Sequence, residues 1–185
     1  MPPPDKFLPN DVELSNTIRR RWLDITQWLK SLIYSEMLDL GNLDAIKKRL
    51  AQTSDDADLF YTLYYGPEVG YSIKLIYQNY YAHVQAMVDA YKDNNMALIE
   101  QQQILLHKDA DELAKLLSRI NRYWDEATMQ ALLYVFVENT EKQIENIVKG
   151  NYEDEIKSYD QYVDQAYRIS DELTYGMIKQ FRIPR

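Results

Sequence analysis

Few side chains in this chain of 185 residues could bind a metal or transfer a proton. It has two histidines, His83 and His107, and no cysteine. A metal centre in a helical bundle is usually marked by a glutamate three residues before a histidine, because that spacing points both ligands into the core one turn apart. Neither histidine has an acidic residue at that position. We expect His83 to be a hydrogen-bonded core residue and His107 to lie at the core boundary.

Phosphate chemistry and nucleophilic catalysis have no clear motif either. A phosphate-binding loop needs glycines that open a helix after a strand. The segment from Gly66 to Gly70 has no strand before it and no lysine or serine in register, which indicates a turn. Without cysteine, disulfides, thiolate metal sites and thiol nucleophiles are excluded. The sequence therefore predicts no catalytic residue, no cofactor and no metal ligand.

Tyrosine is unusually abundant, with 16 copies, and six of them crowd into segments 60–65 and 77–81. Adjacent tyrosines on a helix cannot all face inward. Tyrosine suits interfaces, because it buries a large area at low entropic cost and keeps a hydroxyl for hydrogen bonds. Three alternatives stay open: the core boundary, a partner surface and a ligand cavity. The candidate contact surface consists of Tyr64, Tyr65, Tyr77 and Tyr81.

The composition limits the partners. A net charge of −8 gives no general attraction to nucleic acids or to anionic membranes. No stretch reaches the roughly 18 apolar residues of a membrane helix. The beginning of the chain, residues 1–6, lacks the apolar run of a signal peptide. We expect a cytoplasmic protein with no nucleic-acid or membrane partner.

Apolar residues recur at helical spacing through most of the chain. A first long helix over about 11–38 has one apolar stripe that includes Trp22, and Trp28 widens it. Short helices are expected at 42–52 and 54–65, and long ones at about 67–92, 96–120, 126–149 and 152–181. No segment alternates like a strand. The prediction is an all-α antiparallel bundle with four to five long helices and two short crossover helices. Residues 11–181 form its single domain, after a proline-rich arm at 1–10 and before a tail at 182–185.

Residues at the expected helix ends support these ranges. Asn42 and Asp125 are candidate N-caps, and Ser54 with the two acids after it is expected to open a helix. Pro67 suits a first turn, and Gly150 suits the position just after a helix.

Several segments resemble a family of small bacterial proteins from spore-formers, often labelled acetylglutamate kinase and related to an uncharacterised ferritin-like family. Residues 22–28, with the sequence WLDITQW, are similar to the family's Trp-Leu-Glu-His-x-x-Trp. Residues 64–66, 108–114, 117–124 and 176–181 continue the resemblance in the same order. It implies a ferritin-like bundle. The core and motif residues that carry it are Trp22, Trp28, Asn121, Trp124, Gly176, Gln180 and Phe181.

The chain departs from that family at acid–histidine pairs on three helices. Ile25, Asn79 and Phe136 stand where the family has histidine, and Val135 stands where it has an acid. None of these side chains binds iron, manganese or zinc as imidazole or carboxylate does. The resemblance therefore implies a lost metal site. The kinase label has no support, because the chain lacks phosphate loops and strand–helix alternation.

The leading interpretation is a non-enzymatic helical bundle that acts through protein–protein contact or self-association. The alternative is a ferritin-like protein that binds a metal or small ligand through residual polar core groups, namely Asp24, Gln78, His83 and Glu138. Asp24 would need a partner if buried. We expect an arginine, tyrosine or glutamine side chain as that partner, with Tyr80, Gln78 and Arg168 as candidates.

Overall fold

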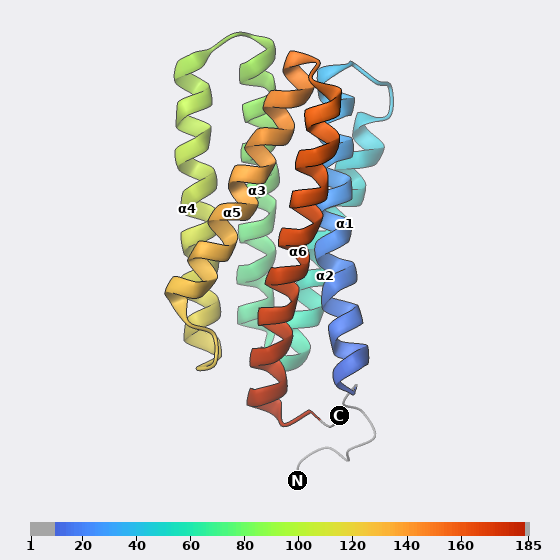
Figure 1. Cartoon of the computed structure of the whole chain (residues 1–185). Coiled ribbons are helices and arrows are strands. Elements are labelled where there is room, and N and C mark those ends of the chain that lie inside the picture. The colour runs from blue at the N-terminus through green and yellow to red at the C-terminus, as the bar shows by residue number, and fades with distance from the viewer. Residues whose placement is uncertain (1–9, 184–185) are drawn as a thin grey trace.

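The computed structural model describes residues 10–183, which form six long helices and no strand. The helices are α1 (Asp11–Met37), α2 (Leu43–Tyr65), α3 (Pro67–Lys92), α4 (Met96–Ile120), α5 (Glu126–Lys149) and α6 (Tyr152–Phe181). Short connections make consecutive helices antiparallel (Figure 1). The all-α bundle is confirmed. The expected arm lies outside the described residues except for Asn10, as do the last two residues of the expected tail.

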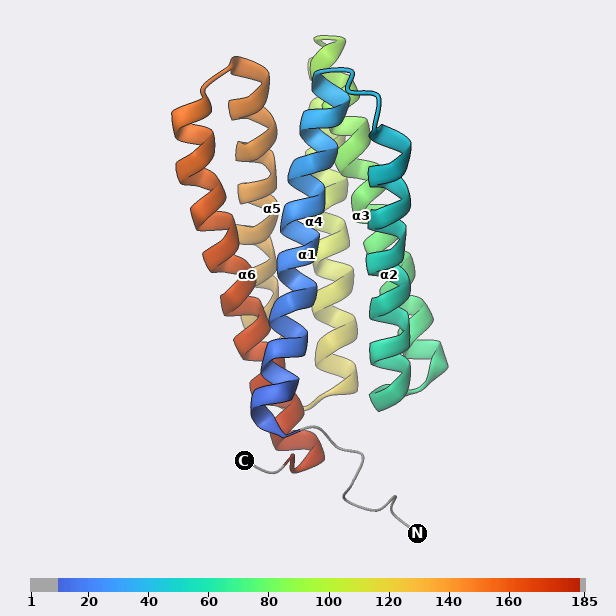
Figure 2. The ribbon, with the colours of Figure 1, turned by 90° about the vertical axis from the view of Figure 1, so that its right-hand side faces the viewer.

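The helices alternate between inner and outer positions. The parallel helices α1, α3 and α5 contact one another. Each remaining helix covers a pair of them: α2 packs on α1 and α3, α4 on α3 and α5, and α6 on α5 and α1. Figure 2 shows α1 between α6 and α2 on one face of the molecule. Among residues 10–183, no helix combines the length and apolar character needed to cross a bilayer.

Local signals fix most helix ends. The Asp125 side chain accepts from the Thr128 backbone N–H at 2.8 Å and caps α5. Gly150 ends α5 in the left-handed conformation, with φ of 69°. Pro67 occupies the first turn of α3. These expected ends are confirmed.

The two short helices expected at 42–52 and 54–65 are wrong, because α2 is continuous through both. Ser54 does not cap a helix; its hydroxyl donates to the Ala51 carbonyl within α2. Asn42 makes no capping hydrogen bond and instead accepts from the Ser35 hydroxyl at 2.8 Å. Small buried residues such as Ser54 and Thr53 let α2 pack closely on α3, and this packing keeps the helix intact.

Trp22 lies in the hydrophobic core, as its position on the α1 stripe predicts. Its ring packs edge-on against Phe136, with centroids 5.1 Å apart, and against Tyr77 at 6.2 Å. Trp28 is half-buried and lies beneath the Arg49 guanidinium. The core is one cluster with contributions from all six helices.

Candidate functional site

The four polar groups of the alternative interpretation do not converge on a core site. Asp24 is half-exposed and pairs with Arg49 of α2 at 2.9 Å. The expected kind of partner, an arginine, is confirmed, but the named candidates Tyr80, Gln78 and Arg168 are wrong. Gln78 and Glu138 are exposed. Within residues 10–183, no group of three or more histidines and acids is arranged to hold a metal ion.

His83 and His107 both lie at the core boundary. The Nδ1 atom of His83 lies 2.6 Å from the Asp109 carboxylate, and the histidine side chain is 25 % exposed. His83 is therefore hydrogen-bonded as expected, but to a carboxylate and with an edge open to solvent. Burial raises the pKa of Asp109, and the His83 contact opposes that shift. His107 packs edge-on against Tyr134.

The positions at which the resembling family has histidine, or in one case an acid, do not share one environment in this structure. Ile25 and Phe136 line a central cavity of about 40 Å³ that is almost wholly apolar. Asn79 and Val135 face solvent. A cavity of this size could hold water, but a water molecule needs polar partners that this lining scarcely offers.

The expected tyrosine contact surface is wrong for Tyr77 and Tyr81, which are buried in the core. The Tyr81 hydroxyl shares a hydrogen bond with Thr53, and burial raises the pKa of both tyrosines. Tyr65 is half-buried and accepts from the Asn121 amide at 3.0 Å. Tyr64 is also half-buried, against Phe60 and Phe181. These tyrosines bind helices together.

Motif residues near the end of α6 and at the α4–α5 connection meet in one cluster. The Trp124 indole donates to the Glu172 carbonyl at 3.2 Å, and Gly176 lies against its ring. The Gln180 amide donates to the Ile120 carbonyl at 2.9 Å. Phe181 packs on Tyr65. These contacts pack the end of α6 against the α4–α5 connection, so the cluster stabilises the fold.

A hollow of about 540 Å³ lies over the outer side of α1, between α2 and α6, and we call it the α1 hollow. Most of its lining comes from the second half of α1 and the start of α2, which lie in the upper part of Figure 2. Tyr159 contributes from α6, and Asn42 and Ile46 contribute from the α2 side. The full lining is Gln27, Lys30, Ser31, Tyr34, Leu40, Asn42, Ile46 and Tyr159.

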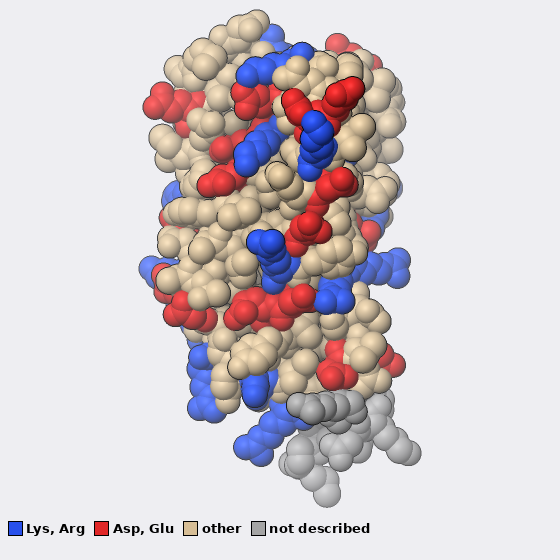
Figure 3. Space-filling view, in the orientation of Figure 1, with Lys and Arg blue, Asp and Glu red and all other residues tan. Residues whose placement is uncertain are grey.

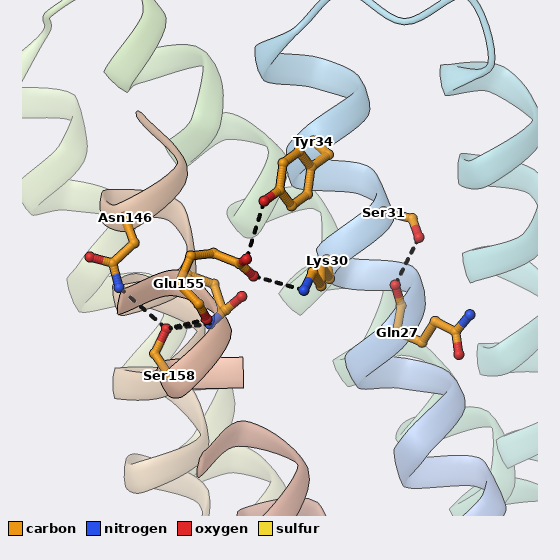
Figure 4. Close-up of polar contacts among 8 residues, drawn as sticks. Gln27, Lys30, Ser31, Tyr34, Asn146, Glu155 and Ser158 are labelled. Atoms are coloured by element: carbon orange, nitrogen blue, oxygen red, sulfur yellow. Dashed lines mark hydrogen bonds and ion pairs between the residues drawn. The ribbon is translucent and has the colours of Figure 1, made fainter. Parts of the chain in front are cut away.

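A buried carboxylate lies beside this hollow. Glu155, in the first turns of α6, is only 2 % exposed, and its side chain reaches toward Lys30 and Tyr34 on α1 (Figure 4). The Lys30 ammonium lies 2.8 Å from Oε1 in an ion pair whose angle does not suit a hydrogen bond. The Tyr34 hydroxyl donates to Oε2 at 3.2 Å. A charge this deeply buried needs such partners.

Two aromatic rings position the Lys30 ammonium. It lies 4.0 Å from the ring centre of Tyr159 and 5.9 Å from that of Tyr34, within the range of cation–π attraction. Burial, with the nearby negative charge of Glu155, raises the pKa of Tyr34 to about 12. Lys30 is thus held in one place at the edge of the hollow.

Side chains of α5 anchor the start of α6. The Gln143 amide donates to the Glu155 carbonyl at 3.1 Å and also to the Ser158 hydroxyl. The Asn146 amide donates to the same hydroxyl at 3.2 Å. Glu155 is therefore preorganised, because its backbone is tied to a second helix.

Exposed apolar side chains lie near the hollow. Leu40 in the α1–α2 connection is 44 % exposed, and Tyr152 and Ile156 on α6 are 55 % and 59 % exposed. Spacings of four and three place Tyr152, Ile156 and Tyr159 on one side of α6. Tyr159 touches Lys30, so this side borders α1. The sequence places Tyr152, Ile156 and Tyr159 on the apolar stripe of the helix expected at 152–181, and helical spacing alone does not show that Tyr152 and Ile156 are exposed.

Charge does not mark a site on the α5–α6 face. Figure 3 shows acidic and basic side chains interspersed there, with no broad area of one sign. One local ion pair joins Lys157 and Asp154 at 3.0 Å on α6.

Comparison of the chain with protein-family models, curated proteins and solved structures found no match.

Proposed function

We propose that this protein is a non-enzymatic helical bundle that acts through protein–protein contact, by self-association at the α1 hollow. The observation that carries the proposal is Lys30, fixed between Tyr34 and Tyr159 by the buried Glu155 beside an open hollow. Preorganised side chains favour binding, because less freedom is lost on association.

The composition of the hollow supports a protein contact. Interface centres are enriched in tyrosine and apolar side chains, with a polar rim. Tyr34 and Tyr159 supply aromatic surface, and Leu40, Tyr152 and Ile156 supply exposed apolar surface nearby. The contact surface that we propose therefore consists of these residues, in place of the expected Tyr64, Tyr65, Tyr77 and Tyr81.

A second copy of the chain is the partner that we propose. Symmetric dimers place one surface against itself, so it must carry complementary groups of its own. Near the hollow, donors such as Lys30 lie beside acceptors such as Gln27 and Asn42. Exposed charges of both signs, Lys157 and Asp154, lie within one turn of Glu155, so this surface would not simply repel a second copy.

The alternative, metal or small-ligand binding through Asp24, Gln78, His83 and Glu138, has less support, because these side chains do not face one site. Kinship with ferritin-like bundles and a cytoplasmic location remain predictions.

Sedimentation velocity over a concentration series tests the proposal. We expect wild type to form a species heavier than the 22.0 kDa monomer. Ile156→Asp should weaken this association at least tenfold, because it places a charge among the exposed apolar side chains beside the hollow. Ile104→Asp is the matched control, since Ile104 on α4 is exposed to a similar extent. A protein that stays monomeric at every concentration, or equal effects of both substitutions, would contradict self-association at this surface.

A further inference from the structure

Arg21 on α1 is a cation without a carboxylate partner among residues 10–183. Neighbouring Arg19 pairs with Asp171 at 2.6 Å, and Arg49 pairs with Asp24. Arg21 instead lies over the Phe60 ring, with its guanidinium carbon 5.1 Å from the ring centre. Its Nε atom is buried and has no hydrogen-bond partner. A buried donor on a permanently charged group is costly to leave unpaired.

Arg21 lines an open apolar groove between α1 and α2, which we call the lower groove. Its volume is about 350 Å³. Its lining comes from the first half of α1 and the end of α2, which lie at the lower ends of these helices in Figure 2, whereas the α1 hollow is lined from the second half of α1 and the start of α2. Leu59 and Leu63, which are 70 % and 76 % exposed, form its α2 wall. The lining consists of Leu14, Thr17, Arg21, Leu59, Phe60, Leu63 and Tyr64.

The lining restricts the chemistry of a ligand. Thr17 and Tyr64 are the only polar residues beside Arg21, and the Thr17 hydroxyl already donates to the Glu13 carbonyl at 2.8 Å. A peptide backbone would therefore find few partners for its amides. An apolar chain would cover the leucine and phenylalanine side chains. A carboxylate at its end would pair with the two terminal nitrogens of Arg21, since the Nε atom is buried and a guanidinium can bind both carboxylate oxygens.

A smaller pocket continues inward from Arg21, but its volume is only about 20 Å³. Asp24 and Asp56 are among its lining residues, so it repels a second anion. The head group of a ligand would stay at Arg21. From Leu14 to Arg21, the helix rises about 10 Å, which sets the length of a chain lying in the groove.

We propose that the lower groove binds a medium-chain fatty acid, with its carboxylate on Arg21 and its alkyl chain between Leu14 and Leu63. This ligand supplies both things that the groove lacks: an anionic partner for Arg21 and a cover for the exposed leucines. The proposal does not depend on self-association at the α1 hollow.

Isothermal titration calorimetry with octanoate, octanol and octylammonium separates the roles of charge and chain. We expect octanoate to bind, and the other two to bind at least tenfold more weakly, because only the carboxylate pairs with Arg21. Hexanoate has two methylenes fewer than octanoate and should bind about fourfold more weakly. The difference is modest because a half-open groove buries only part of each methylene.

Matched variants locate the site. Arg21→Gln should weaken octanoate binding at least tenfold, whereas Arg20→Gln, with the same change of charge, should change it less than twofold, because Arg20 is exposed and outside the groove. Leu63→Asp should also weaken binding at least tenfold, with Ile104→Asp as its control. The Leu63 side chain is exposed, so this variant should fold even if Arg21→Gln does not, which thermal melts will show.

Four results would each overturn the proposal. They are no octanoate binding to wild type, equal binding of all three amphiphiles, equal losses in Arg21→Gln and Arg20→Gln, and full binding by Leu63→Asp. A leucine-terminated peptide with a free carboxylate that binds where octanoate does not would also overturn it, in favour of a protein ligand.

Discussion

Gly176 on α6 lies directly against the indole ring of Trp124, so that a Cβ atom at position 176 would overlap the ring. The indole is buried and donates to the Glu172 carbonyl one turn earlier on α6. The two residues therefore fix the distance between α6 and the α4–α5 connection.

Gly176→Ala should destabilise the protein, although alanine favours helix. Overpacking a fixed ring costs about 3 kcal/mol, at the upper end of the usual range. The gain in helix propensity returns about 1 kcal/mol. We expect a net loss of about 2 kcal/mol in urea unfolding. Gly41→Ala is the control, because a Cβ there meets nothing and the change should be close to neutral. Equal stabilities of the two variants would contradict the close approach at Trp124.

Trp22→Ala should cost about 3–5 kcal/mol, because it empties a large site in the core. Trp22 contacts Tyr77 and Phe136 in the interior. Trp28→Ala is the matched control and should cost less than half as much, since Trp28 is only half-buried. Unfolding in guanidinium measures both. A loss below about 1 kcal/mol for Trp22→Ala would show that Trp22 does not lie in the hydrophobic core.

Lys30→Met should destabilise the chain by leaving the Glu155 carboxylate buried without its cation. Breaking a buried ion pair costs about 3–5 kcal/mol, but Lys30 is 26 % exposed and water can replace part of its charge, so we expect about 2 kcal/mol. The double variant with Glu155→Gln should recover at least half of the loss in urea unfolding. Additive losses in the double variant would show that the two groups do not interact.

Tyr34 should make stability sensitive to alkaline pH. Its pKa rises from an ordinary 10.0 to about 12 in the folded chain, so the folded state holds the phenol proton longer. The stabilising contribution is complete below pH 10 and is lost as the pH rises from 10 to 12. Tyr34→Phe should lose less stability than wild type over this interval in thermal melts. Carbon-13 NMR of labelled tyrosine should find Tyr34 still protonated at pH 11; titration near 10 would contradict the shift.

Local chemistry in the sequence predicts the helices where it controls their ends. Asp125, Gly150 and Pro67 act as expected because caps and first turns depend on residues a few positions away. Ser54 shows the limit. A serine followed by two acids looks like a helix start, but its hydroxyl satisfies a carbonyl within α2. Packing of α2 against α3 determines that this segment stays helical, and the local sequence pattern carries no information about that packing.

The candidate site could not be predicted because it depends on contacts between distant helices. Tyrosine abundance indicated a special role, but Tyr77 and Tyr81 are buried where α3 packs in the bundle, and only the fold determines which tyrosines face solvent. The pairing of Glu155 with Lys30 spans most of the chain. Arg49 of α2 was likewise missed as the partner of Asp24, since the angle between α1 and α2 sets that contact.

Hydrogen–deuterium exchange at low and high protein concentration tests self-association at the α1 hollow most directly. Backbone amides of the α1–α2 connection, residues 38–42, lie outside the helices. Those of Leu38, Leu40 and Asn42 make turn hydrogen bonds, which open locally without unfolding of the bundle. We predict that deuterium uptake at 38–42 and at the start of α6 slows as concentration rises in wild type, but not in Ile156→Asp. The connection at 93–95, outside the proposed contact, should exchange at the same rate at both concentrations. Uptake at 38–42 that is independent of concentration, while the protein self-associates, would contradict the account.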